Sequence, residues 1–235
     1  MVRWKWLGVL FLALAGVVQG AEPVAMFEPE ARILFQGDSI TDGNRGRSAD
    51  PNHILGHGYQ FIVAAKQGAA FAEHKLEFSN RGISGNTVLD LEKRWQKDTL
   101  DLKPTVLSIL IGVNDNSRGV TLEQYEQTYD KLLAATQTAL PKIKFVLCEP
   151  FTLATPGKER PAAWNEELAK RGLIVAKLAQ KYDAAFVPFQ QAFHDATKRA
   201  PAAYWIWDSV HPTYAGHQIM ADAWESAVRT KWGKK

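Results

Sequence analysis

The stretch Arg32–Ser39 reads RILFQGDS, and it combines the signal of a strand with a reactive side chain. Its first five residues form an apolar run that is typical of a buried strand, and Gly37 ends that run. In an α/β chain, a residue directly after a strand lies outside the carboxyl edge of the sheet, where ligands bind. Ser39 is therefore a candidate nucleophile. The alternative is that it caps the helix that follows, which serine does often.

The rest of the chain repeats this order of a strand followed by a helix. Further strands are expected at 76–79, 105–110, 144–149 and 184–187, and helices at about 58–71, 87–96, 122–139 and 162–182 and after Pro212. Such alternation indicates a parallel sheet with helices on both faces. We therefore predict an α/β fold: a three-layer α/β/α sandwich around a central, mostly parallel five-stranded sheet.

Two loops at the same edge of this sheet carry hydrogen-bond donors. Gly85 follows the strand expected at 76–79, and Asn114 follows the strand expected at 105–110. The N–H of Gly85 and the side-chain amide of Asn114 could point at one oxygen atom, as an oxyanion hole requires. Taken alone, each residue is better explained by turn chemistry, because glycine and asparagine are favoured wherever the backbone bends sharply.

The segment Asp208–Pro212 places a carboxylate and an imidazole three residues apart, directly before the last expected helix. This spacing lets Asp208 hold one ring nitrogen of His211 and leaves the other nitrogen free. A serine delivered to the free nitrogen would complete a nucleophile, a base and an orienting acid in the chain order Ser, Asp, His.

Four blocks together resemble the SGNH branch of the GDSL esterase/lipase family: Gly37-Asp38-Ser39, Ser84-Gly85-Asn86, Gly112–Asp115 and Asp208–Pro212. The resemblance implies the flavodoxin-like SGNH hydrolase fold. It also implies that Ser39 is the nucleophile, His211 the general base and Asp208 the residue that orients His211. The implied oxyanion hole consists of the N–H groups of Ser39 and Gly85 and the side chain of Asn114.

Three further segments are similar to the xylan and xylo-oligosaccharide acetylesterases of this superfamily: His57-Gly58-Tyr59, Gly85–Leu91 with Arg94-Trp95, and Trp207–Pro212 with Ala215-Gly216-His217. The similarity implies a carboxylic ester hydrolase that removes O-acetyl groups from carbohydrates, with no cofactor. One alternative is a lysophospholipase, a thioesterase or a small-ester hydrolase that uses the same site. A non-catalytic carbohydrate-binding protein is the other, and the complete catalytic set argues against it.

Three residues near the blocks are candidates for substrate binding. Trp205 and Trp207 precede Asp208 and could wall the acyl pocket or stack on a sugar, although core packing explains them nearly as well. Arg45 lies in the long loop 42–56 and could contact a sugar or the acetate product. A solvated surface loop is the stronger interpretation for Arg45.

The histidines outside these blocks are not expected to bind a metal. His53 and His57 have the i, i+4 spacing of zinc ligands, but the glutamate of the His-Glu-x-x-His motif is missing. His217 is expected on the last helix in a structural role. We therefore predict no metal site.

Residues 1–20 have the three-part pattern of a secretory signal peptide: Arg3 and Lys5, the apolar run 7–18, and small residues at 20 and 21. The apolar run is shorter than the ~20 residues of a membrane-spanning helix, so no stable membrane anchor is expected. The sequence predicts export to the periplasm or the medium. Without residues 1–20, 26 basic and 25 acidic side chains remain, and this balance does not favour nucleic acid as a partner.

The exported part fits one domain, 32–235, preceded by a leader at 21–31. With 46% hydrophobic residues, the chain can bury a substantial core. Cys148 is the single cysteine, so the chain forms no internal disulfide, and its place in an apolar strand predicts core packing. The sequence leaves open whether the protein forms a homo-oligomer.

Overall fold

A computed structural model of the chain describes residues 27–48 and 50–233. The predicted signal peptide and leader residues 21–26 lie outside these described residues. Five strands form one sheet in the order β2-β1-β3-β4-β5, and every neighbouring pair is parallel. The strands are β1 (Arg32–Gly37), β2 (Glu77–Asn80), β3 (Val106–Leu110), β4 (Lys144–Cys148) and β5 (Ala185–Val187).

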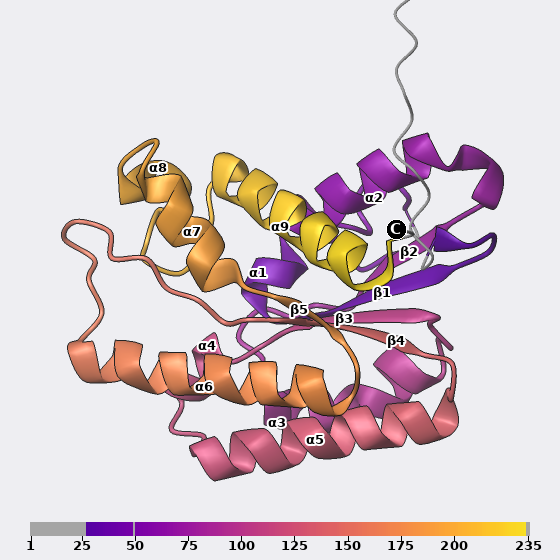
Figure 1. Ribbon diagram of the computed structural model, residues 1–235, viewed down its shortest axis with the longest axis horizontal. Helices are drawn as coiled ribbons and strands as arrows, with labels where there is room; N and C mark the ends of the chain where they lie inside the picture. The colour runs from indigo at the N-terminus through magenta and orange to yellow at the C-terminus, as the bar shows by residue number, and fades with distance from the viewer. Residues whose placement is uncertain (1–26, 49, 234–235) are drawn as a thin grey trace, which may run out of the picture.

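Helices cover both faces of the sheet, as Figure 1 shows. One face carries α2 (Tyr59–Ala70), α7 (Phe189–Thr197) and α9 (Tyr214–Trp232); the other carries α3 (Val88–Trp95), α5 (Leu122–Ala139) and α6 (Ala162–Lys181). The prediction of an α/β fold with a five-stranded sheet is therefore confirmed, and the sheet is parallel throughout.

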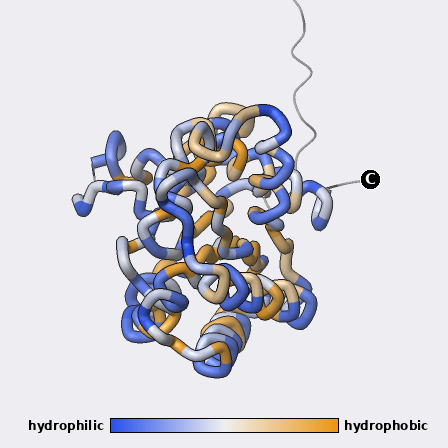
Figure 2. The backbone as a smooth tube through the Cα atoms, turned by 90° about the vertical axis from the view of Figure 1, so that its left-hand side faces the viewer, coloured by the Kyte–Doolittle hydropathy of each residue, from blue (hydrophilic) through white to orange (hydrophobic). Residues whose placement is uncertain are grey.

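The strands divide their side chains between two separate hydrophobic cores, because successive residues of a strand point to opposite faces. In β1, Phe35 packs in the core under α2 and α9, whereas Leu34 packs in the core over α3 and α5. In β3, Val106 and Leu107 divide in the same way. Hydrophobic stretches run through the middle of the molecule in Figure 2, and hydrophilic ones lie mostly on the outside.

Several short elements lie between these layers. They are α1 (Ser39–Asp42), the 3₁₀ turn η2 (Ala72–His74), the π-helical turn η3 (Gln96–Leu100), α4 (Val113–Ser117) and α8 (Ala202–Trp205). Apart from the helix after Ser39 that the capping alternative implies, the sequence-based prediction contains none of them, and it also lacks α7. In α7, Phe189, Phe193 and Ala196 recur at i, i+4 and i+7 and are buried, so its amphipathic pattern is present but short.

The described end of the leader is packed into the core. The ring of Phe27 is 1% exposed and stacks on Phe71 with 6.0 Å between the ring centroids. Cys148 is buried in β4, and burial raises its pKa to about 12, so the group is a packed thiol rather than a reactive thiolate. No helix within the described ranges is long and apolar enough to span a membrane.

Candidate active site

Ser39, His211 and Asp208 form a continuous chain of hydrogen bonds. The Oγ atom of Ser39 lies 2.8 Å from Nε2 of His211, and Nδ1 of His211 lies 2.7 Å from Oδ2 of Asp208. The other oxygen of Asp208 accepts the N–H groups of His211 at 2.6 Å and of Val210 at 3.1 Å. Partial burial alone would raise the pKa of Asp208. The bonds from His211 and Val210, together with the charge of His211, outweigh burial and hold this pKa below its usual range.

The turn between β1 and α1 fixes Ser39 at the edge of the sheet. Asp38 caps α1 by accepting the N–H of Ile40 at 3.0 Å, and Ser39 is the first residue of the helix. Gly37 is required before it, because a Cβ atom there would overlap the carbonyl oxygen of Leu110 in β3. In Figure 1, α1 and α4, which follow β1 and β3, lie toward the same side of the molecule.

The three groups predicted for an oxyanion hole each have an N–H that no protein acceptor in the described residues uses. Within the described residues, no acceptor takes the N–H of Ser39 or of Gly85. The side chain of Asn114 uses one N–H on the carbonyl oxygen of Asn86 at 3.1 Å, which leaves its second N–H available. Gly85 has a φ of 81°, in the left-handed region that favours glycine, and the guanidinium of Arg118 lies over its Cα.

The half-buried guanidinium of Arg94 holds the loop that carries Gly85. Its Nε donates to the side-chain oxygen of Asn86 at 2.8 Å, and its Nη1 donates to Gln36 at 2.9 Å and to the carbonyl of Arg81 at 2.8 Å. One side chain thus links the end of β1 to the residues on both sides of Gly85. Since Asn86 also receives the bond from Asn114, Arg94 indirectly positions both loops.

The loop 42–56 is tied to the same region. The carboxylate of Asp42 is buried, pairs with Arg47 at 2.7 Å and accepts the N–H of Ser84 at 2.9 Å. Arg45 donates from Nε to the carbonyl of Gly82 at 2.9 Å. The arginines of this loop therefore brace the segment before Gly85, and the structure does not place Arg45 in the lining of the pocket at Ser39.

A cavity of about 240 Å³ opens beside Ser39 and His211. Trp207 forms part of its wall and stacks on the ring of His211 at 6.0 Å, with Lys158 over the indole at 4.9 Å. Trp205 is 4% exposed and donates from its indole N–H to Ala200, so it belongs to the core rather than to the cavity wall. The lining residues are Ser39, Ile40, Gly43, Asn44, His57, Ser84, Trp207, His211, Pro212 and His217.

Sequence reasoning did not assign several residues of this region to the site, among them three with polar side chains in the cavity wall and one arginine. Asn44, His57 and His217 line the cavity, and Arg118 lies over Gly85. His57 and His217 belong to segments that resemble the acetylesterases, so this resemblance was the available signal. Arg118 carries no signal in the sequence, because it reaches the site only through the direction of its side chain from the end of α4.

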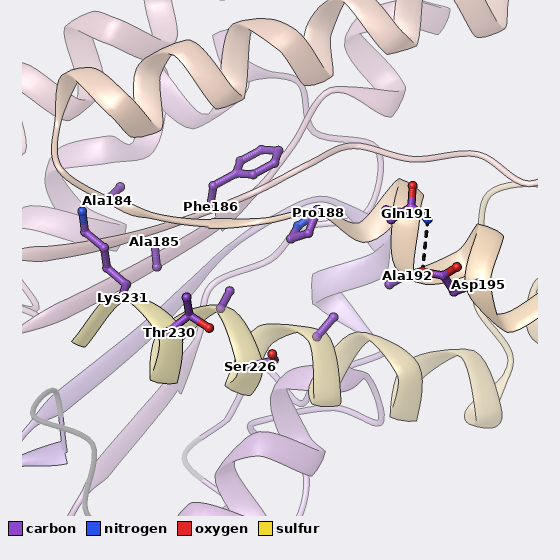
Figure 3. Close-up of a pocket in the computed structure, with 12 residues that line it drawn as sticks. Ala184, Ala185, Phe186, Pro188, Gln191, Ala192, Asp195, Ser226, Thr230 and Lys231 are labelled. Carbon is purple, nitrogen blue, oxygen red and sulfur yellow. Dashed lines mark hydrogen bonds between the residues drawn. The ribbon is translucent and has the colours of Figure 1, made fainter. Parts of the chain in front are cut away.

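A larger groove of about 530 Å³ lies elsewhere, between β5, α7 and α9 (Figure 3). Its walls consist mainly of small apolar side chains, and none of the three hydrogen-bonded residues above contributes to it. In the described part of the chain, no group of three or more potential metal ligands is clustered. His53 bonds to the carboxylate of Asp50 at 2.7 Å.

A serine linked through a histidine to an aspartate, beside unoccupied backbone and amide donors, is the arrangement of a serine hydrolase. The comparison with known families agrees with this class. Residues 35–219 match the GDSL-like lipase/acylhydrolase family. The chain belongs to this family, and it is a serine esterase acting on carboxylic esters.

Similar proteins align with most of the chain. It is 34% identical to an acetylxylan esterase of Geobacillus stearothermophilus over 213 residues, 86% of this chain and 95% of the relative. Among solved structures, a GDSL-like lipase from Parabacteroides merdae is 40% identical with a TM-score of 0.83, covering 88% of this chain and 99% of that one. The acetylxylan esterase Axe2 of G. stearothermophilus is 33% identical with a TM-score of 0.78, covering 86% and 96%.

Proposed function

We propose that this esterase removes acetyl groups from hydroxyl groups of carbohydrates, with acetylated xylan or xylo-oligosaccharides as the substrates to test first. In this proposal Ser39 is the nucleophile, His211 the general base and acid, and Asp208 the residue that orients His211. Two N–H groups, of Ser39 and Gly85, and the amide of Asn114 stabilise the oxyanion. The 2.8 Å contact between Ser39 Oγ and His211 Nε2 is the observation that carries the assignment.

The reaction follows from these positions. His211 takes the proton of Ser39 while the oxygen forms a bond to the acetyl carbon, and the carbonyl oxygen becomes an oxyanion. When the bond from the acetyl carbon to the sugar oxygen breaks, His211 returns the proton to that oxygen. Water then attacks the acetyl-serine in the same way, and acetate leaves. The bonds from Asp208 keep the imidazole in the orientation that both proton transfers need.

The size and chemistry of the cavity beside Ser39 favour a hydroxylated alcohol and leave no room for a long acyl chain. At about 240 Å³ it is smaller than the ~300–1,000 Å³ of most ligand pockets. Six of its ten lining residues carry polar side chains, which suit hydroxyl groups better than a long acyl chain. Ser39 is not among the residues that line the larger apolar groove of Figure 3. An acetylxylan esterase among the relatives supports the same substrate class.

The test is release of acetate from acetylated xylo-oligosaccharides by the purified protein, beside a series of chromogenic esters of increasing acyl length. We expect acetate release and a sharp loss of rate beyond short acyl chains. The matched control is Ser39→Ala, which should lower kcat at least about 10³-fold without unfolding the protein. A preference for long acyl esters would indicate a lysophospholipase or thioesterase instead. Near-normal turnover by Ser39→Ala would overturn the choice of nucleophile.

We also propose that the protein is exported after removal of residues 1–20. The support is the positive start, the apolar run and the small residues at 20 and 21 in the sequence. Expression of the full chain in a Gram-negative host, followed by fractionation and N-terminal sequencing, tests this. A cytoplasmic protein that keeps residue 1 would contradict it.

A further inference from the structure

His217 has its ring almost entirely buried at the start of α9, with one nitrogen used by the fold. Its Nδ1 accepts the backbone N–H of Tyr59, the first residue of α2, at 3.1 Å. A nitrogen that accepts a hydrogen bond carries no proton, so the proton of the neutral ring is on Nε2. The backbone of α2 thus selects the tautomer that has a donor at Nε2.

The remaining nitrogen of His217 reaches the cavity at Ser39. The residue is 6% exposed and lines that cavity. No group in the described residues bonds to Nε2, yet this atom is absent from the fully buried polar atoms that have no partner. Nε2 is therefore not fully buried, and since His217 lines the cavity and its Nδ1 is bonded to Tyr59, Nε2 is the nitrogen that can donate to a group bound there.

Tight packing fixes the direction of this donor. A Cβ atom at Gly216 would overlap the carbonyl oxygen of Trp205, so a glycine is needed for α9 to approach α8 this closely. The cap of α9 adds a second anchor, since Thr213 accepts the N–H of Gly216 at 3.2 Å. With the ring also bonded to Tyr59, His217 has little freedom to turn away from the cavity.

The lining of the cavity indicates that it receives the alcohol part of the ester. Its walls include His211, which protonates the leaving oxygen, and they do not include Gly85 or Asn114, which are assigned to the oxyanion. A group bound among His57, Trp207 and His217 is therefore the alcohol part of the ester. A sugar supplies hydroxyl and ring oxygens there as acceptors.

We propose that His217 is a specificity-determining residue that donates a hydrogen bond from Nε2 to an oxygen of the sugar in the leaving-group site. This role rests on the proposed carbohydrate substrate. Burial, with smaller contributions from the charges of His57 and His211, lowers the pKa of His217 to about 4. The ring thus stays neutral at physiological pH and adds no positive charge beside His211, which must itself become charged during catalysis.

The test uses two replacements of His217 that separate its two nitrogens. His217→Asn keeps an acceptor for the N–H of Tyr59 and removes the donor at Nε2, whereas His217→Gln can return an N–H to the position of Nε2. His194→Asn, at an exposed histidine on α7, is the matched control. For each variant, kcat/KM is measured with acetylated xylo-oligosaccharides and with a chromogenic phenyl acetate whose leaving group has no sugar hydroxyls.

We expect His217→Asn to lower the ratio of kcat/KM for acetylated xylo-oligosaccharides to kcat/KM for the phenyl acetate. The expected loss is about 2- to 13-fold, the range for loss of one neutral hydrogen bond. We expect His217→Gln to recover most of this ratio and His194→Asn to keep it. An unchanged ratio in His217→Asn, or no recovery in His217→Gln, would overturn the role of His217 alone. A wild-type protein that cleaves phenyl acetate but no sugar acetate would overturn the carbohydrate substrate, and this role with it.

Discussion

The carboxyl group of Asp38 is buried directly beside the nucleophile. Its replacement by asparagine tests how this burial changes the free energy of unfolding with pH. The residue is 1% exposed, and one of its oxygens has no hydrogen-bond partner in the described residues. Burial raises the pKa of Asp38 from 3.8 to about 7; the charge of Asp115 adds to the rise, and the bond from Ile40 opposes it.

The sign of the pH dependence follows from this raised pKa. Between pH 4 and pH 7 the folded protein keeps a proton on Asp38 that the unfolded chain has released. The contribution of Asp38 to the free energy of unfolding is therefore intact below about pH 4, falls as the pH rises toward 7, and stays low above it. Three pKa units at ~1.36 kcal/mol each set an upper bound of about 4 kcal/mol.

Asp38→Asn keeps the shape of the side chain and an acceptor for Ile40 but removes the charge. We expect the variant to gain stability relative to the wild type as the pH rises, by about 2–4 kcal/mol between pH 4 and pH 8. The new amide N–H also needs a partner, and its cost of about 1–3 kcal/mol is independent of pH. For this reason the quantity to measure is the change of the stability difference with pH, from urea unfolding at one-unit intervals.

The matched control is Asp195→Asn on α7. The carboxylate of Asp195 is exposed and bonded to Lys198, and this bond holds its pKa below the usual range. Its replacement should therefore change stability in the opposite direction as the pH rises. A stability difference between the wild type and Asp38→Asn that stays constant from pH 4 to pH 8 would refute the raised pKa of Asp38.

Asp208→Asn preserves the size of the side chain, but its amide oxygen is needed by the N–H groups of Val210 and His211, so its NH2 faces Nδ1 of His211 and selects the wrong tautomer. The kcat for a chromogenic acetate is therefore expected to fall about 10⁴-fold, and a loss below tenfold would contradict the orienting role of Asp208. Arg94→Lys keeps the charge but loses the fork that spans Gln36 and Asn86, and we expect kcat to fall at least about tenfold with little change in KM for the same ester. Because the pKa of His217 is lowered in the folded protein, the unfolded chain protonates this histidine at a higher pH than the folded protein does. The free energy of unfolding therefore falls as the pH falls from about 6.5 to about 4. In urea unfolding, the free energy of unfolding of His217→Gln should fall less than that of the wild type over this pH interval, by up to about 3 kcal/mol. The same pH dependence in both proteins would disprove this contribution.

The sequence by itself determined the fold class and the edge at which the site lies. Strand and helix signals alternate because β1, β3 and β4 are almost entirely buried whereas the long helices are amphipathic, and both patterns are local. Parallel strands then bring all their carboxyl ends to one edge, so Ser39, Gly85 and Asn114 had to converge there. The predicted bounds of the five strands agree with the observed ones within one residue, the usual uncertainty at the end of an element.

Only the tertiary structure decided which side chains face the cavity. Trp205 and Trp207 are two residues apart with similar chemistry, yet one packs in the core and the other lines the cavity, because α8 ends between them. The same holds for Arg45, whose bond to Gly82 joins residues that are 37 positions apart. The donor of His217 depends on Tyr59, 158 positions away. Such contacts are set by the packing of distant segments, and no local pattern in the sequence contains them.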